Sequence, residues 1–124
     1  MSLFKGITVI SYPVMNWEAA KKFYGELLEW PVAWSSDEMG CVEYGSENQT
    51  HLSISLWRDA TPPDRRGPIA VLEVEDAHKT IAALRAKGVR CDDVVDIPGV
   101  VSYGTLYDPE GNQIQFAGSP PPAA

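Results

Sequence analysis

The sequence predicts an α+β fold in which two βαβββ repeats form a curved mixed sheet, with a concave ligand cleft on one side and the helices outside. Two observations predict this fold. A strand, a helix cap and an amphipathic helix follow one another twice, with Asn16 and Asp76 at equivalent points about 60 residues apart. Short alternating segments separated by turn residues then follow each helix. One repeat alone would leave a sheet face uncovered, so two copies should pair, within one chain or across a dimer.

The first repeat begins with the alternating segment ITVISYPV at residues 7–14, which predicts a strand. Asn16 is a good helix N-cap, and the segment WEAAKKFYGELLEW after it predicts a helix that ends before Pro31. Residues 31–57 then divide into three short strands around the turn segments SSDEMG and GSENQ. The apolar side chains of the helix recur on one face and should lie on the sheet: Ala20, Phe23, Tyr24, Leu27 and Leu28.

The second repeat follows a linker rich in proline and charged residues. It has the strand IAVLEV, a cap at Asp76, and the helix AHKTIAALRAK ended by Gly88. The segments VRCDDVVDIPG, VSYGTLY and NQIQF supply the remaining strands, and a tight turn at residues 108–111 joins the last two. We therefore expect a single domain over residues 1–124, with repeat one at about 5–57, a linker at 58–68, repeat two at about 69–118 and a tail at 119–124.

Charge and composition narrow the class of partner. Seventeen acidic residues against ten basic ones give a net charge of −7, which repels nucleic-acid phosphates and anionic membrane surfaces. No segment has the apolar length of a membrane span, and the N-terminus lacks the pattern of a secretory signal. Cys41 and Cys91 are too far apart for a CxxC motif and are expected to be reduced structural thiols. We expect a cytoplasmic protein that binds neither nucleic acid nor membrane.

Two segments carry a resemblance to a known family. NWEAAKKFYGELLEW after the first strand and YDPEGNQIQF near the end, together with the order of the repeats, resemble the vicinal oxygen chelate superfamily of glyoxalases, extradiol dioxygenases and bleomycin-resistance proteins. The resemblance extends over nearly the whole chain, and it implies a small organic ligand in the cleft and a homodimer. It does not identify a reaction, because enzymes and pure binding proteins share this fold.

The resemblance also implies four metal-ligand positions, one on the first strand and one on the last strand of each repeat. Counting back seven residues from each helix cap gives Val9 and Ile69; the last-strand positions fall at Gln115 and at Ser55, or at Ser53 if the repeats are offset by two residues. Alkyl side chains cannot bind a metal, and amide or hydroxyl oxygens are weak ligands for zinc, nickel or iron. We therefore expect neither a metal nor another cofactor. Gln115 would keep the shape of a glutamate without an unpaired charge.

The cleft-facing side chains are expected to hold a flat, partly apolar ligand through neutral hydrogen bonds and apolar contacts. The predicted ligand-binding residues are Val9, Ser11, His51, Ser53, Ser55, Ile69, Val71, Gln113 and Gln115. The aromatic residues in the strands or at their ends either pack in the core, form dimer contacts or close the cleft: Trp30, Trp34, Tyr44, Trp57, Tyr103 and Tyr107.

Three titratable residues are candidates for catalysis. His51 shares a strand face with Ser53 and Ser55, and is either bonded to backbone or water, in contact with the ligand, or a proton carrier. Glu73 and Glu43 are either hydrated surface carboxylates or general bases at the rim of the cleft. His78, in the first turn of the second helix, is expected to face solvent.

Three functions follow from these observations. The first is a small-molecule-binding protein without a metal centre, with sequestration of a toxic compound as one biological role. The alternative is a glyoxalase-type lyase or isomerase, or a dioxygenase, with a rearranged metal site around His51 or a carboxylate base. The third is a regulatory or scaffold module whose cleft is not used.

Overall fold

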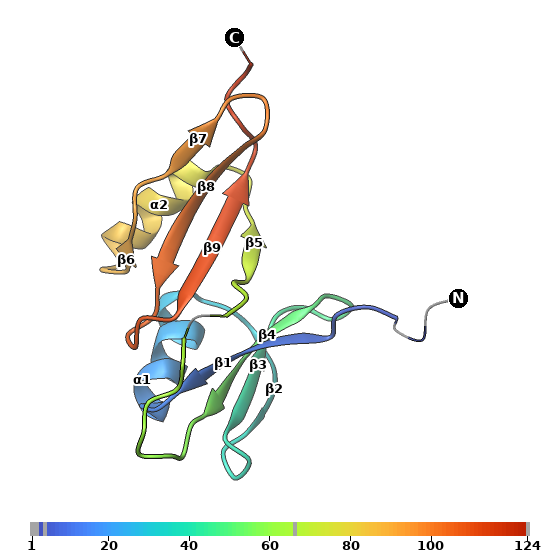
Figure 1. Ribbon diagram of the computed structural model, residues 1–124, viewed down its shortest axis with the longest axis vertical. Coiled ribbons are helices and arrows are strands. Elements are labelled where there is room, and N and C mark those ends of the chain that lie inside the picture. Colours follow the sequence, from blue (N-terminus) through green and yellow to red (C-terminus); the bar gives the residue numbers. More distant parts are fainter. Residues whose placement is uncertain (1–2, 4, 66, 124) are drawn as a thin grey trace. The chain divides into compact units, whose positions relative to one another are not determined.

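The computed structural model of the protein describes residues 3, 5–65 and 67–123. The chain forms two compact units, residues 1–64 and residues 65–124 (Figure 1). Each unit has one mixed sheet with a helical segment on one of its faces, so the prediction of an α+β fold with mixed sheets is confirmed. Within the described residues, no helix has the length and apolar character needed to cross a membrane.

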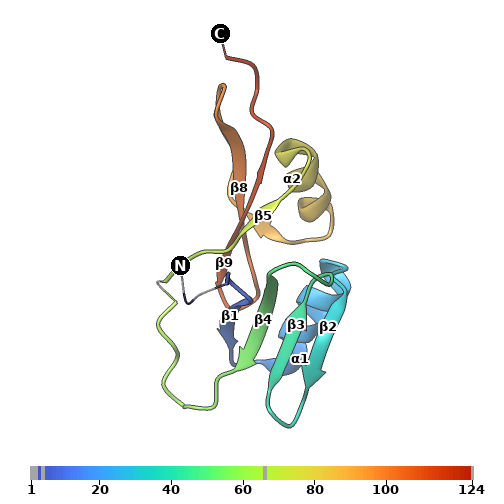
Figure 2. The same cartoon turned by 90° about the vertical axis from the view of Figure 1, so that its right-hand side faces the viewer.

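The first unit contains a four-stranded sheet in the order β1-β4-β3-β2 (Figure 2). The first and last strands pair in parallel, and the other neighbours are antiparallel. The strand-turn segmentation predicted around SSDEMG and GSENQ is therefore found in the structure. The strands are β1 (Val9–Val14), β2 (Val32–Ser36), β3 (Cys41–Tyr44) and β4 (His51–Leu56).

The helical segment of this unit begins where its cap predicts. The Asn16 side chain accepts a hydrogen bond from the Ala19 backbone N–H at 3.1 Å, which satisfies one of the unpaired donors of the first turn. An α-helical part, α1 (Trp17–Lys21), continues as a wider π-helical part, η1 (Lys22–Leu27). The change to π-helical geometry was not expected from the sequence. Glu29, in the left-handed region at φ 54°, ends the segment before Pro31.

Strand alternation separates a buried face from an open face in the first sheet. The buried face packs against the helical segment and includes Tyr12, Val14, Val42, Tyr44, Leu52 and Ile54, opposite Ala20, Phe23 and Tyr24. The Tyr24 and Tyr44 rings stack with centroids 5.8 Å apart, and Trp30 stacks on the other side of Tyr44 at 6.4 Å. Tyr44 is thus a core residue, and burial raises the pKa of its phenol to about 12.

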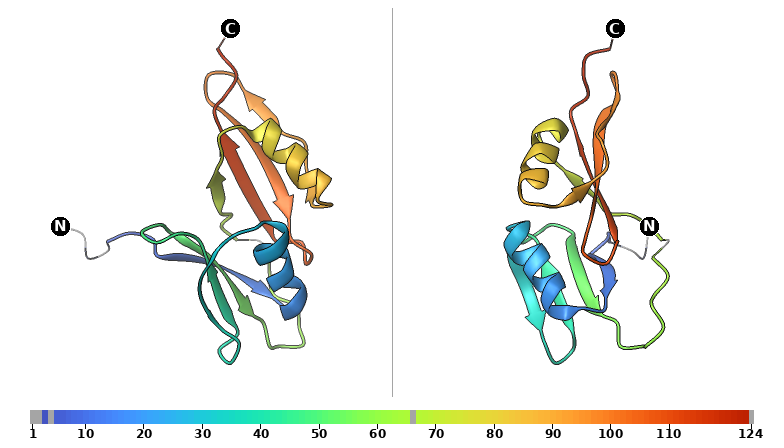
Figure 3. Two further views of the ribbon diagram at one scale, coloured as in Figure 1. Left: turned by 180° about the vertical axis from the view of Figure 1, so that it is seen from behind. Right: turned by 90° about the vertical axis from the view of Figure 1, so that its left-hand side faces the viewer.

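The second unit contains a sheet in the order β5-β9-β8-β6, and β7 pairs with β8 beside it. As in the first unit, the first and last strands are parallel. The helix α2 (Ala77–Ala86) lies along β8 and β9 (Figure 3). The strands are β5 (Val71–Glu73), β6 (Arg90–Cys91), β7 (Val95–Ile97), β8 (Val101–Tyr107) and β9 (Gln113–Gly118).

The single strand expected over VRCDDVVDIPG is instead two short strands, β6 and β7. The break falls at Asp92 and Asp93, which have low strand propensity and bond elsewhere. Asp92 accepts a hydrogen bond from the Tyr107 hydroxyl, and Asp93 pairs with Arg85 of α2 at 2.8 Å. Two adjacent carboxylates with separate partners therefore interrupt the ladder.

Both ends of α2 agree with the sequence signals. Asp76 accepts hydrogen bonds from the His78 and Lys79 backbone N–H groups, and Gly88 ends the helix at φ 82°. The core beneath the helix includes Ile81, Leu106, Ile114 and Phe116. Gly104 makes room for Phe116, because a Cβ atom at this position would lie 2.4 Å from the Phe116 ring.

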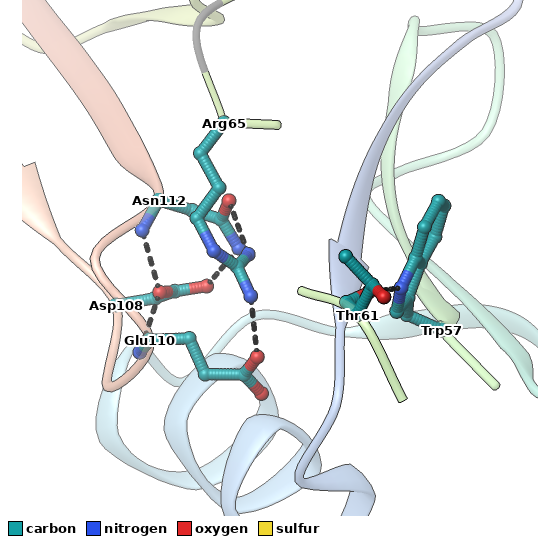
Figure 4. Close-up of polar contacts among 6 residues, drawn as sticks. All are labelled: Trp57, Thr61, Arg65, Asp108, Glu110 and Asn112. Atoms are coloured by element: carbon teal, nitrogen blue, oxygen red, sulfur yellow. Dashed lines mark hydrogen bonds and ion pairs between the residues drawn. The ribbon is translucent and has the colours of Figure 1, made fainter. Parts of the chain in front are cut away.

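A polar network holds the start of the second unit to the β8–β9 turn (Figure 4). The Arg65 guanidinium donates to Asn112 Oδ1 at 2.8 Å and to Glu110 Oε1 at 2.7 Å. Asp108 Oδ1 accepts from the backbone N–H groups of Glu110 and Asn112, and Asn112 donates from Nδ2 to Asp108 Oδ2. The predicted turn at residues 108–111 is therefore fixed by side chains as well as by its backbone bond from Gly111 N–H to Asp108 C=O.

In the first unit, Figure 4 also shows Trp57 donating to the Thr61 carbonyl at 2.8 Å.

We predict that Arg65→Met lowers the free energy of unfolding by about 2 kcal/mol, because it leaves Glu110 and Asn112 without their charged donor. The Arg65 and Glu110 side chains are only 20% and 15% exposed. The matched control is Arg85→Met. The Arg85 and Asp93 side chains are 47% and 92% exposed, so this ion pair should contribute less than about 1 kcal/mol to the free energy of unfolding. Urea unfolding of the full chain measures both. Equal costs for the two substitutions would contradict a special role for the Arg65 network.

Candidate functional site

The open face of the first sheet carries a row of polar side chains that crosses all four strands. The register places Ser11 of β1 opposite Ser53 of β4, Ser53 opposite Glu43 of β3, and Glu43 opposite Trp34 of β2. We call this row, Ser11–Ser53–Glu43–Trp34, the polar row. Cross-strand neighbours on one face have Cβ atoms about 5 Å apart, so these side chains are within reach of one another.

Three serines on this face form a chain of hydroxyl groups. Ser53 donates to Ser11 Oγ at 2.9 Å, and the hydroxyls of Ser11 and Ser55 are 2.8 Å apart. Ser53 is 2% exposed, whereas Ser11 is exposed and Ser55 is half-buried. The chain of hydroxyls therefore runs from a buried anchor to the surface of the sheet.

His51 is held at one end of this face by two acceptors. Its Nδ1 lies 3.0 Å from Glu43 Oε1, and its Nε2 lies 3.1 Å from the Ser46 carbonyl oxygen. Both oxygens only accept hydrogen bonds, so both interactions form together only when the ring carries two protons. The bond to Glu43, followed by the bond to Ser46, raises the pKa of His51. His51 and Glu43 thus form an imidazolium–carboxylate pair.

Gly45 accommodates this histidine. A Cβ atom at Gly45 would lie 3.0 Å from His51 Cδ2, and the backbone there has φ 135°, which side chains with a Cβ atom rarely adopt. The end of β3 is therefore shaped so that the imidazole can lie across it.

His51 is the one histidine among the described residues of the first unit, and both of its nitrogens are engaged. A histidine that binds a metal needs a free nitrogen lone pair, and both His51 nitrogens point at acceptor oxygens. Val9, the cross-strand partner of His51, has no donor atom. Over the described ranges, no three His, Cys, Asp or Glu side chains come together in a group that could hold a metal ion.

The open face of the second sheet has a different row, formed by Val71, Gln115 and Thr105 of neighbouring strands. Gln115 is half-buried, and its Nε2 lies 3.4 Å from Thr105 Oγ1, which is a weak contact. Gln113 is the cross-strand partner of Tyr107. Val71 is exposed, and so is Ile69. The centre of this face offers an amide, a hydroxyl and an alkyl group, and the charged side chains of Glu73 and Arg90 lie on the same face nearer its edges.

The registers identify which residues of the two units correspond. Ser11 and Val71 each precede their helix cap by five residues; Ser11 pairs with Ser53, and Val71 pairs with Gln115. The counterpart of Gln115 is therefore Ser53 rather than Ser55, which is the two-residue offset considered from the sequence. The central position of both open faces thus carries a neutral polar side chain.

Some residues fall outside the groups that the sequence suggested. Glu73, a candidate base, is exposed and lines a shallow pocket of about 500 Å³ with Glu75, Gly118 and Ser119. Thr105 was missed, although alternation with Tyr103 and Tyr107 in VSYGTLY places all three on one face. The Arg90 guanidinium lies over the Tyr107 ring, 4.1 Å from its centroid, so Tyr107 is engaged by a cation on this face.

A second polar cluster, His78–Asp96–Ser102, lies in the second unit. His78 Nε2 and the Ser102 hydroxyl both bond Asp96 Oδ1. A nucleophilic triad needs the histidine between the serine and the acid, and here the acid is in the middle. His78 is largely exposed, as its position in the first helical turn indicated. The cluster therefore connects α2 to β7 and β8 without activating the serine.

This geometry defines a class: a protein of two related units, each with a mixed sheet whose first and last strands are parallel and whose open face carries polar side chains. A family model described as "Glyoxalase/Bleomycin resistance protein/Dioxygenase superfamily" matches residues 6–116, and the chain belongs to this superfamily. A search of curated protein sequences finds no match.

Similar solved structures share the fold at low identity. TnmS3, an antibiotic binding protein from Streptomyces sp. CB03234, is 22% identical, with 99% of this chain and 100% of that chain covered and a TM-score of 0.76. A glyoxalase family protein from Bacillus anthracis is 19% identical over 96% and 98%, with a TM-score of 0.78. Lactoylglutathione lyase from Agrobacterium tumefaciens is 16% identical over 93% and 94%, with a TM-score of 0.69. A binding protein and an enzyme thus share this fold.

We predict that the pKa of His51 lies above 6.5, the ordinary value for histidine, and falls in Glu43→Gln. Because the folded-state pKa is raised, the pair stabilises the fold fully at pH values below about 6.5, and this contribution is lost as pH rises through the folded-state pKa. NMR titration of the His51 ring protons, assigned with a His51→Gln variant, measures it. A His51 pKa that does not change in Glu43→Gln would contradict the pairing.

Proposed function

We propose that the protein binds a small organic molecule on the open faces of its sheets, and that it does so without a metal centre. The observation that carries the proposal is that the positions expected for metal ligands carry neutral side chains, and that these lie beside a chain of hydrogen-bonded hydroxyl groups. Val9 and Ile69 are alkyl side chains, each 39% exposed, and Ser11, Ser53 and Ser55 form one hydroxyl chain beside Val9. Exposed alkyl groups next to fixed polar groups suit a flat, partly apolar ligand.

The second unit is proposed to bind the ligand through the same kinds of alkyl and neutral polar side chains. These are Ile69, Val71, Gln113 and Gln115. A glutamate at position 115 without a cation would be an unpaired charge on a partly desolvated surface, whereas glutamine keeps the shape and remains neutral. Sequestration of a toxic compound would be consistent with this chemistry, and the antibiotic binding protein with the same fold supports that role.

The enzyme alternative requires a rearranged metal site or a carboxylate base. A metal site at His51 would first have to break its bond to Glu43 or to Ser46. Of the two carboxylates, Glu43 is the better candidate base, because it is half-buried on the open face while Glu73 is exposed. The engagement of Glu43 by His51 and the exposure of Glu73 favour binding over catalysis.

We predict that flat aromatic compounds stabilise the protein in thermal-shift assays, and that a chelator changes neither the shift nor the affinity. A ligand at a hundred times its Kd adds about 2.7 kcal/mol to the free energy of unfolding. Elemental analysis of protein purified without a histidine tag should find no stoichiometric zinc, nickel, iron or manganese. Such a metal, lost in His51→Ala, would overturn the proposal in favour of the metal enzyme.

The matched variants for this assay are Ser11→Ala and Ser35→Ala. Ser11→Ala removes the central hydroxyl of the chain and should weaken binding by about 0.5–1.5 kcal/mol. Ser35 lies on β2 with its side chain on the opposite side from Trp34, so Ser35→Ala should leave binding unchanged. Equal effects of both changes would place the ligand elsewhere.

We further propose a cytoplasmic homodimer. Both cysteines are free thiols, which suits a reducing compartment. The edge strand β2 has no charged residue and exposes Val32 and Trp34, and uncharged apolar edges favour pairing with another chain.

We predict a dimer in sedimentation experiments at micromolar concentration, and its dissociation by Val32→Glu. A charge on the edge strand would be buried without a partner in the dimer. Met39→Glu, in the exposed turn after β2, is the control and should remain dimeric. A wild-type protein that stays monomeric at every concentration would contradict the homodimer.

A further inference from the structure

The polar row and its neighbours offer many hydrogen-bond acceptors and very few donors. The hydroxyl chain of Ser11, Ser53 and Ser55 contains three protons, and its two internal bonds use two of them. One hydroxyl proton, on Ser11 or Ser55, and the indole N–H of Trp34 are therefore left for a ligand. Most of the oxygen lone pairs of the chain remain open, because each hydroxyl oxygen can accept two hydrogen bonds.

The histidine adds no donor to this surface. Both N–H groups of protonated His51 are used, one by Glu43 Oε1 and one by the Ser46 carbonyl. Glu43, by contrast, uses only one of its oxygens. In the described part of the chain, Oε2 has no hydrogen-bond partner, and the side chain is 27% exposed. The open face thus presents a charged acceptor that is not satisfied within the protein.

We propose that the ligand of this face is a flat organic molecule that donates hydrogen bonds, and that Glu43 Oε2 is the acceptor that selects it. This inference rests on the proposed function and specifies its ligand class as hydroxyl- or amino-substituted aromatic compounds. Ether- or carbonyl-bearing compounds without a donor would desolvate Glu43 Oε2 without giving it a hydrogen bond, which is costly.

The neighbours of Glu43 support this assignment. Trp34, 45% exposed, is the cross-strand partner of Glu43 on one side, and Ser53 is its partner on the other. A ring stacked on the indole would therefore place a substituent over the carboxylate, about one strand spacing of 4.8 Å away. Because His51 neutralises Glu43, the ligand needs a donor group and no net charge.

The test compares two probes that differ only in a donor: β-naphthol and its methyl ether. Ligand-observed NMR titrations on the wild-type protein should give an affinity about three- to tenfold higher for β-naphthol, the value of one hydrogen bond. In Glu43→Gln the amide oxygen is expected to remain bonded to His51, which turns the Oε2 position from an acceptor into an N–H donor. The preference should then fall to about one or reverse.

The control is Glu26→Gln, which makes the same charge change at an exposed glutamate of η1 and should leave the preference at its wild-type value. Thermal melting of both variants checks that they are folded. Equal binding of the two probes to the wild type, or an unchanged preference in Glu43→Gln, would overturn this inference and leave the proposed function in place. Failure of both probes and of every flat aromatic compound in the thermal-shift assay would overturn both.

Discussion

The parallel pairing of the first and last strands in each unit is the constraint on which the other features depend. A parallel neighbour cannot be reached by a tight turn, so the chain must leave the sheet and return through other elements, and in both units a helix follows the first strand. The pairing also fixes which side chains meet across the strands. Ser11 meets Ser53 in the first unit and Val71 meets Gln115 in the second, so the chemistry of each open face follows from one register.

The second determining feature is the interaction of His51 with Glu43 and with the Ser46 carbonyl oxygen. A histidine between a carboxylate and a carbonyl oxygen is satisfied only as a cation, and the carboxylate beside it then has a fixed counter-ion. The two residues that look most reactive on this face, His51 and Glu43, are therefore bonded to each other, and the bond favours the protonated ring of His51. A pair of this kind fixes the orientation of both side chains and gives the binding surface its polarity.

Much of the fold could be predicted from local signals. Asn16 and Asp76 act as caps, Gly88 ends α2, and the Asp108 turn joins β8 and β9, because these features depend on neighbours within a few residues. Alternation also placed Ser53, Ser55 and His51 on one face. The split between β6 and β7 was not predicted, because the contact of Asp92 with Tyr107 joins residues 15 positions apart. The π-helical turn was not predicted either, and no local signal in the sequence indicated it. The Glu43–His51 bond was missed although the two residues are only eight positions apart, because it depends on the exact register of β3 against β4.

The pairing of Val9 with His51 has a consequence for how functions change within this fold. The two side chains are cross-strand partners on the open face, so a single substitution, Val9→His, would put two imidazoles next to each other. A second metal-binding side chain could thus be gained by a single substitution. The larger obstacle is the salt bridge, because His51 must give up its proton and Glu43 must turn from counter-ion to ligand before a cation is bound. In evolutionary terms, the barrier between binder and metalloenzyme lies less in acquiring residues than in releasing the ones already present.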